Sequence, residues 1–301
     1  MNVTQLRAFV SVVELGSFSE AARRAGVSQP AVTMQIKSLE ADVGATLLDR
    51  RYHRVELTEA GLALLPHARS VLADIAAARD DIQGLAETLT GHLVIASSTT
   101  PGDYVIPKHL AGFLRENPQV QVEITVQDSA DAVTAVETGR ADLGIAGVAD
   151  PSAKVVFSEL GSDEIVVICA PSHPFARRKA VPFSELAEAD WVWREPGSGT
   201  GQVVRRSLIE RGVDPDELRV MVELGTGDAI VSAIEGGLGI AMVSRFAAEK
   251  ALALGTIVRV DVEGEPILRP FFTVLPTSTP SRAALAFAEH LRSALAIRAG
   301  R

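Results

Sequence analysis

Residues 27–40 read VSQPAVTMQIKSLE, and this stretch decides the fold of the N-terminal part of the chain. Ser28 is a residue type that caps helices, and Pro30 then falls in the first turn, where its missing N–H costs nothing. The apolar residues that follow recur at spacings of four, three and four, which is the period of a helix with one buried face. They are Val32, Ile36, Leu39 and Val43.

The opposite face of this predicted helix is polar. Gln29 lies at the helix start, and Thr33, Met34 and Lys37 follow on the outer face. Amide and hydroxyl groups at the start of a helix can hydrogen-bond the edges of DNA bases in the major groove. A surface helix of a small bundle has the same apolar spacing, so the pattern alone leaves that alternative open.

Two more short helices are predicted before this one. Thr4 is the expected N-cap of the first helix, which ends at Gly16, and Ser19 is the expected N-cap of the second, which ends at Gly26. The apolar positions of the first helix are Leu6, Phe9, Val10 and Val13. Together the three segments predict a helix-turn-helix.

A basic hairpin is predicted directly after the helices. Residues 49–58 read DRRYHRVELT, which alternates like a strand pair and places Arg50, Arg51 and Arg54 within five positions. Arginines beside a reading helix suit contacts to DNA phosphates. A solvated charge run is the alternative, but helices, turn and basic wing together favour DNA binding.

Composition limits the remaining possibilities. The 301 residues, 47% hydrophobic and 22% charged, are typical of a soluble chain of about two domains. No apolar run approaches the length of a membrane span, and the N-terminus does not resemble a secretory signal, so we expect a cytoplasmic protein. Cys169 has no second cysteine to pair with, and the six histidines lack zinc-ligand spacing, so neither a metal nor a cofactor is expected.

Charge is distributed unevenly. Residues 1–65 contain seven basic and seven acidic residues, whereas residues 91–301 contain 20 basic and 27 acidic ones and hold most of the net charge of −9. A neutral head on an acidic body suggests two functions.

Between them, residues 59–90 predict a long helix. Positions 65, 68, 72, 75, 79, 82, 86 and 89 are apolar except for Arg79 and follow a three-four repeat. We expect this stripe to pair with a second copy of the chain. An amphipathic helix packed on its own domain is the alternative.

From residue 91 onward, short apolar strands alternate with helical stretches, which predicts a parallel sheet covered by helices. Clusters of hydroxyl and glycine residues follow the strands. They are residues 97–102, 128–129, 197–201 and 225–227. Each cluster alone is typical of helix caps, but helix starts that converge from two lobes could bind a small anion.

These stretches together resemble the LysR-type transcriptional regulators. The resemblance rests on residues 6–10, 16–22, 27–40, 44–50 and 57–61. It implies an α/β protein with an all-α head: a winged helix-turn-helix (1–58), a dimerising linker helix (59–90) and an effector domain (91–301). The effector domain would have two lobes like the periplasmic solute-binding proteins, one of residues 92–162 and 268–301, the other of residues 163–267.

The resemblance also implies site residues. The DNA contacts would come from Ser28, Gln29, Pro30, Thr33, Lys37, Arg50 and Arg54. The effector would be a small, anionic metabolite bound by Ser98, Thr99, Thr100, Ser129 and Gly147 in one lobe and by Ser198, Thr200 and Thr226 in the other.

The expected partners are operator DNA, the effector and further copies of the chain as dimers or tetramers, with RNA polymerase as a further candidate. The segment 193–200, with residues 98–100, is similar to the branch that regulates carbon dioxide fixation and sulfur assimilation. That branch commonly carries arginine directly after Ser-Gly-Thr, where this chain has Gly201.

Enzyme functions find little support. Residues 197–201 match neither a phosphate-binding loop nor a dinucleotide fingerprint, and Cys169 lies in an apolar run without a sequence-suggested base. The other alternative is a ligand-binding protein that uses residues 1–90 only for assembly. A salt-dependent affinity for DNA would distinguish a DNA-binding regulator from such a protein.

Overall fold

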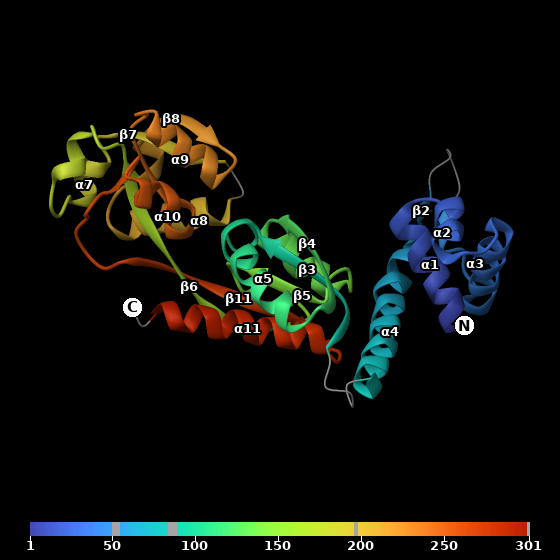
Figure 1. The fold of residues 1–301 in the computed structure, drawn as a ribbon. Helices are drawn as coiled ribbons and strands as arrows, with labels where there is room; N and C mark the ends of the chain where they lie inside the picture. Colours follow the sequence, from blue (N-terminus) through green and yellow to red (C-terminus); the bar gives the residue numbers. More distant parts are fainter. Residues whose placement is uncertain (50–54, 84–88, 196–197, 300–301) are drawn as a thin grey trace.

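The computed structural model of the 301-residue chain describes residues 1–49, 55–83, 89–195 and 198–299 (Figure 1). Three helices open the chain: α1 (Val3–Leu15), α2 (Phe18–Ala25) and α3 (Gln29–Val43). Strands β1 (Leu48–Asp49) and β2 (Glu56–Leu57) pair antiparallel, and the long helix α4 (Glu59–Gln83) follows them. The predicted helix-turn-helix and the strands of its wing are therefore confirmed.

Two of the expected caps are wrong by two residues. Asn2, rather than Thr4, caps α1 and forms a reciprocal capping box with Gln5. Ser17, rather than Ser19, caps α2, because its extended backbone lets its hydroxyl accept from the N–H of Glu20. The third cap is confirmed: Ser28 accepts from the N–H of Ala31 at 3.4 Å.

The buried face of α3 holds the head together. Ile36 and Leu39 are fully buried against Phe9 and Val12 of α1. The expectation for Val43 is wrong: 39% of this residue is exposed, because it is the last residue of α3 before the left-handed cap at Gly44 and extends past the core.

Helix α4 belongs to the head over its first half. Ala68 is buried in the same apolar cluster as α1 and α3, and Leu64, Leu65 and Leu72 pack against it. The first three positions of the predicted stripe therefore pack within their own chain, as in the alternative interpretation, whereas the side chains at 79, 82 and 86 lie outside the described part. Leu89 packs on the core of the body.

One buried arginine of α4 touches both the head and the body. A nitrogen of Arg69 lies 3.4 Å from a carboxylate oxygen of Glu14 in α1, and another lies 3.5 Å from the carbonyl oxygen of Thr138. Only 8% of its side chain is exposed, and its Nε has no partner among the described residues. Burial lowers the pKa of this guanidinium, and Glu14 opposes that shift.

The body contains one mixed sheet. Its strands are β3 (Thr90–Ser98), β4 (Gln119–Gln127), β5 (Leu143–Ala146), β6 (Val155–Cys169), β7 (Asp190–Arg194), β8 (Arg219–Leu224), β9 (Ile240–Ser244), β10 (Val258–Arg259) and β11 (Ile267–Pro276). Their order is β4-β3-β5-β11-β6-β9-β7-β8, with β10 beside β6. The predicted parallel pairing holds for β3 with β4 and β5 and for β7 with β8 and β9, but β11 and β6 run antiparallel to their neighbours.

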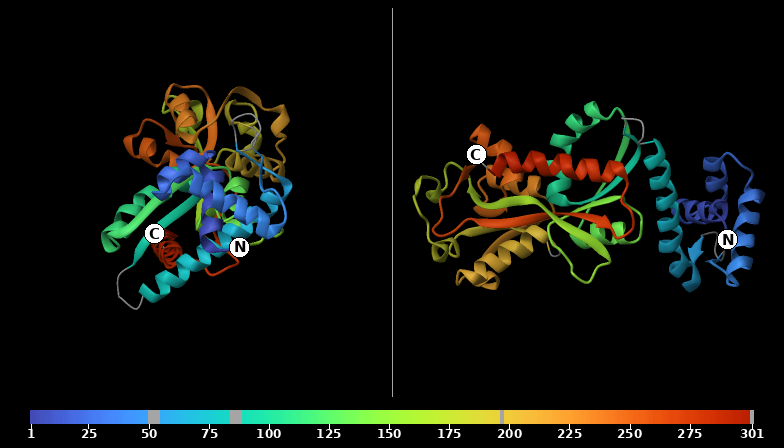
Figure 2. Two further views of the ribbon diagram at one scale, coloured as in Figure 1. Left: turned by 90° about the vertical axis from the view of Figure 1, so that its right-hand side faces the viewer. Right: turned by 90° about the horizontal axis from the view of Figure 1, so that it is seen from below.

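The long strands β6 and β11 pass side by side through the whole body (Figure 2, right). They pair from Ile267 opposite Ile165 to Pro276 opposite Val155, with a bulge at Phe271/Phe272. The first half of β6 is partly polar and lacks a clear alternation, so its sequence alone gives little indication of a strand. Helix α10 (Arg245–Leu254) begins directly after β9.

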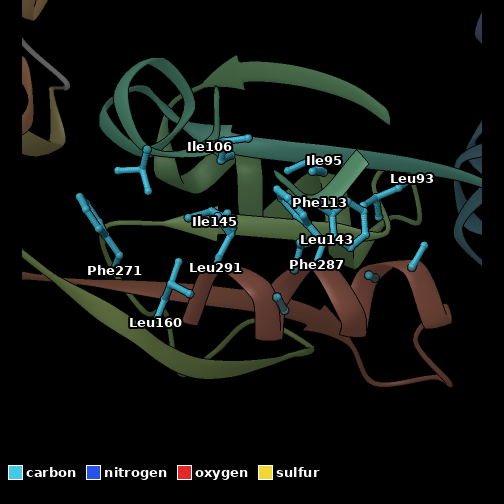
Figure 3. Close-up of a cluster of buried hydrophobic side chains, with 14 of the residues drawn as sticks. Leu93, Ile95, Ile106, Phe113, Leu143, Ile145, Leu160, Phe271, Phe287 and Leu291 are labelled. Carbon is cyan, nitrogen blue, oxygen red and sulfur yellow. The ribbon is translucent and has the colours of Figure 1, made fainter. Parts of the chain in front are cut away.

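The described residues of the body form four hydrophobic clusters, two in each half, and the two largest are its main cores. The first contains Phe113, Phe271 and Phe287, packed between α5 (Ile106–Glu116), α11 (Arg282–Ala299) and the sheet (Figure 3). The second surrounds Trp191, whose indole N–H donates to the carbonyl of Leu186 at 2.8 Å. We call the parts around these cores the first lobe, with β3, β4, β5, α5, α6 (Ser129–Glu137) and α11, and the second lobe, with β7, β8, β9, α8 (Gly199–Glu210), α9 (Gly227–Glu235) and α10.

Two kinds of feature are absent from the described residues. None of the helices there is long and apolar enough to cross a membrane. Within the same residues, no group of three or more histidine, cysteine or acidic side chains is arranged to hold a metal ion.

Candidate effector cavity and DNA-reading surface

A small cavity of about 70 Å³ lies between the lobes, where strands end and helices begin. Residues after β3, at the start of α6 and after β5 line it from the first lobe, and the end of β7 and the start of α8 line it from the second. The lining residues are Ser98, Thr99, Thr100, Asp128, Ser129, Gly147, Val148, Arg194, Glu195, Ser198, Gly199, Thr200 and Arg269.

The three hydroxyls after β3 are the least engaged. Ser98 and Thr100 are buried, yet neither they nor Thr99 form a side-chain hydrogen bond within the described ranges. Thr100 precedes the π-helical turn Pro101–Val105 and makes no side-chain cap bond to it. A capping role, the alternative that the sequence left open, therefore finds no support at Thr100. These hydroxyls can donate to a ligand in the cavity.

Other hydroxyls of the cavity already accept one hydrogen bond. Ser198 caps α8 by accepting from the N–H of Gly201 at 3.2 Å, and Ser129 accepts from the N–H of Gly147 at 3.2 Å. A hydroxyl that accepts still has its own proton to donate. These residues combine a structural bond with a donor that faces the cavity.

One expected site residue lies elsewhere. Thr226 is exposed, does not line the cavity, and caps α9 by accepting from the N–H of Ala229 at 3.1 Å. The sequence suggested a convergence of helix starts, but the start of α9 reaches the cavity region through Gly227, which lines a small adjoining hollow with Tyr104 and Arg194.

Two polar contacts join the lobes beside this hollow. The hydroxyl of Tyr104 donates to Asp228 at 2.8 Å, and Lys108 of α5 pairs with Glu249 of α10. Burial and the bond to Asp228 raise the pKa of Tyr104. A β-carbon on Gly227 would lie only 2.9 Å from the Tyr104 hydroxyl oxygen, so the close approach of the lobes requires glycine there.

A buried ion pair was not identified from the sequence, and one of its members, Arg269, lines the cavity. Arg269 of β11 lies opposite Asp163 of β6, with a nitrogen–oxygen distance of 2.6 Å and exposures of 5% and 0%. Arg269 also donates to the Thr200 hydroxyl at 2.8 Å, and Asp163 accepts from Ser244 at 3.0 Å. Burial raises the pKa of Asp163, while Arg269 and Ser244 oppose that shift. A single arginine in the otherwise apolar stretch ILRPFF was the available signal.

A second arginine of the cavity, Arg194, lies within the segment 193–200. Arg194 ends β7 and lines the cavity, where both oxygens of Glu195 accept from it at 2.8 Å. A β-carbon on Gly201 would lie 3.3 Å from the Arg194 β-carbon, so Arg194 stands directly beside the position where related proteins commonly carry arginine. The cavity therefore has guanidinium groups despite Gly201.

The expected DNA-reading residues gather at one end of α3. Ser28, Gln29, Pro30 and Lys37 are exposed, and Thr33 is half-buried. Met34 on the same face is 71% exposed. The expected phosphate contacts Arg50 and Arg54 lie outside the described residues. Polar side chains and an exposed methionine on one helix face are free to enter a groove.

The α3 face and the cavity each lie in a part of the chain that matches a known protein family. Residues 3–62 match the model of the bacterial regulatory helix-turn-helix protein, lysR family, and residues 86–296 match that of the LysR substrate binding domain. The chain thus belongs to the LysR family of DNA-binding transcriptional regulators.

Individual relatives and solved structures show which regulators this chain resembles. The chain is 31% identical to a probable RuBisCO transcriptional regulator of Cyanidioschyzon merolae, with 95% of this chain and 96% of that one covered. The full-length OxyR of Pseudomonas aeruginosa has the same fold, at 22% identity and a TM-score of 0.81 over 98% of this chain and 94% of that one. The regulatory domain of Synechocystis CcmR, solved in complex with 2-PG, is 27% identical with a TM-score of 0.62 over 68% and 98%. Homologues named as regulators of RuBisCO support the carbon-fixation branch and a regulator rather than an enzyme.

The ion pair gives the first prediction. Arg269→Met should lower the free energy of unfolding by about 3–5 kcal/mol, because it leaves the Asp163 carboxylate buried without its counter-charge. The double variant Asp163→Leu/Arg269→Met should recover most of this loss, since neither charge then remains. Denaturant titration of the full-length variants measures both. A double variant no more stable than the single one would show that the pair's role is not charge compensation.

Proposed function

We propose that the chain is a cytoplasmic regulator in which residues 1–58 read operator DNA, residues 59–90 mediate self-association and residues 91–301 bind a small anionic metabolite that changes operator affinity. One observation carries this proposal: the same chain has an exposed polar start on α3 and an inter-lobe cavity with buried hydroxyls that make no side-chain bond among the described residues. A protein that only assembled through its head would have no need for the first feature.

The α3 surface supports sequence readout. Gln29 is exposed at the first position of α3, where an amide can make two hydrogen bonds to adenine. Lys37 lies two turns further along the same helix, where a point charge suits a phosphate. The two side chains should therefore contribute differently to binding.

The second prediction separates these contributions. Gln29→Ala should cost about 1–3 kcal/mol of operator affinity and reduce discrimination between operator and unrelated DNA. Lys37→Ala should weaken binding to both DNAs alike. Fluorescence anisotropy at fixed salt measures both ratios, using an operator located by footprinting upstream of the gene. An unchanged operator preference in Gln29→Ala would remove Gln29 from the reading face.

Self-association is supported by the geometry of readout. One reading helix contacts only a few base pairs, so two half-sites are needed for adequate specificity. On α4, Ile75 is half-buried and is not among the described residues that form the head core. It is the described stripe position that remains available for a second copy.

The third prediction tests this position. Ile75→Glu should dissociate the assembly toward a mass of 31.9 kDa, because a carboxylate at the seam would be buried unpaired. Ala73→Glu is the matched control, since two residues along a helix rotate a side chain by about 200° to the other side. Light scattering reports the mass. An assembly unaffected by Ile75→Glu would exclude this part of α4 from the interface.

An anionic effector is supported by the cavity's own groups. Hydroxyl donors from the first lobe face helix starts and two guanidinium groups, which together favour an anion. The CcmR regulatory domain, which this chain resembles, was solved with 2-PG. We therefore take 2-PG as the first compound to test.

The fourth prediction concerns Ser98 and Thr100. Replacing both by alanine should remove about 1–3 kcal/mol of ligand affinity per lost partner and abolish the ligand-induced change in operator affinity. Operator affinity without ligand should persist. Thr226→Ala is the control: it should lower the free energy of unfolding by about 1 kcal/mol, because a helix cap is lost, and keep the ligand-induced change in operator affinity. Operator titrations with and without 2-PG, beside thermal melts, decide. A preserved response in the double variant would contradict the site.

A further inference from the structure

The guanidinium of Arg194 is oriented by a carboxylate from its own chain. Its Nε and one terminal nitrogen each donate to a different oxygen of Glu195, both at 2.8 Å, and the terminal nitrogen also lies 3.3 Å from the carbonyl of Gly225. This is the two-bond fork that arginine forms with carboxylates and phosphates. Glu195 therefore occupies the face that an anionic ligand would use.

The two partners differ in burial. Only 8% of the Arg194 side chain is exposed, whereas 37% of the Glu195 side chain is exposed, and both line the cavity. The Glu195 carboxylate is already partly in contact with water, so it can become fully hydrated when it leaves Arg194. An ion pair with an exposed partner is also weak. The arginine, by contrast, cannot regain water and needs a replacement anion.

The other arginine of the cavity cannot exchange its partner in this way. Asp163 is fully buried, and it accepts from Ser244 as well as from Arg269. Arg269 in turn donates to Thr200. The Asp163–Arg269 pair is therefore fixed, and of the two cavity-lining arginines Arg194 is the one whose partner can leave.

The groups around Arg194 suit an incoming anion with further oxygen atoms. Thr99, Thr100 and Thr200 line both the cavity and the adjoining hollow together with Arg194. The hydroxyls of Thr99 and Thr100 make no side-chain bond to other described residues, so they can donate to oxygens that Glu195 does not supply. Two acidic residues of the first lobe lie near these groups: Asp128 lines the cavity, and the carboxylate of Asp103 interacts electrostatically with Arg194.

We propose that Arg194 is the residue that recognises the effector's carboxylate or phosphate and that Glu195 is an internal competitor, which the effector displaces from Arg194. The proposal rests on the proposed function of the cavity and names its ligand class. Because only molecules with Glu195 displaced can bind, the apparent affinity is the intrinsic affinity reduced by their fraction. Glu195 thereby lowers the apparent affinity of every anion by the same factor, so anions with a weak intrinsic affinity bind little.

Calorimetric titration of the full-length protein with inorganic phosphate tests the exchange. Glu195→Gln should bind phosphate about tenfold more tightly than the unmodified chain, because the amide has no charge with which to hold Arg194. Arg194→Gln should bind it at least tenfold more weakly, and Arg194→Lys should recover part of the loss, since it keeps the charge without the fork.

Glu185→Gln is the matched control. Glu185 forms the same two-bond contact with Arg178, but outside the cavity, so this variant should leave phosphate affinity unchanged. Thermal melts verify that each variant is folded. A phosphate affinity in Glu195→Gln that equals or falls below that of the unmodified chain overturns the proposal, as does full binding by a folded Arg194→Gln.

The experiments distinguish failure of the competitor role of Glu195 from failure of the proposed function. Phosphate binding is measured without DNA, so tighter binding by Glu195→Gln stands even if no anion changes operator affinity, and that second result would contradict the proposed function alone. Conversely, 2-PG could regulate operator binding while Glu195→Gln gains no affinity. That outcome would overturn only the competitor role.

Discussion

The ion pair between Asp163 and Arg269 is the contact on which the two-lobed body depends. It joins β6 and β11, the two strands that pass between the lobes, at a point where both side chains are buried. Burying two charges is unfavourable unless hydrogen bonds offset the lost hydration, and here Ser244 donates to Asp163 and Thr200 accepts from Arg269, while the Nε of Arg269 has no partner among the described residues. Because Ser244 and Thr200 belong to β9 and α8, the pair also fixes the second lobe against the crossing strands. Arg269 of this pair also lines the cavity.

The cavity in turn takes part of its positive charge from a β-strand. Gly201 leaves space against the stem of Arg194, and the guanidinium of Arg194 supplies a charge from a neighbouring strand instead of from the helix. Such a charge is held by β-sheet hydrogen bonds at its backbone, so its position is better defined than that of a side chain in a loop. The selectivity of the cavity among anions then depends on which groups compete with them for Arg194.

Sequence reading predicted the head closely because its signals are local. Caps, helix-ending glycines and a three-four period lie within a few residues of one another, and the errors were shifts of two residues at Thr4 and Ser19. The hydroxyls after β3 were found for the same reason. The antiparallel pairing of β11 and the contact of Arg269 with Asp163 could not be found, because 106 residues separate the partners and strand register is a property of the folded sheet. Positions 65, 68 and 72 of the linker stripe pack on the head of their own chain, which the sequence could not show because a helix period indicates a buried face without indicating what covers it.

Helix α6 connects the cavity to the head through its two ends. Ser129 at its start faces the cavity, and the carbonyl of Thr138, directly after its last turn, accepts from Arg69 of α4, which also reaches Glu14 of α1. Nine residues of helix span about 13 Å and resist compression along the axis. The helix therefore holds a cavity residue and a contact of α4 at a fixed separation. Linkage makes any coupling along this path reciprocal: an effector that loosened the grip on DNA tenfold would itself be held tenfold less tightly by the DNA-bound protein. The operator is, in that thermodynamic sense, a ligand of the sensor.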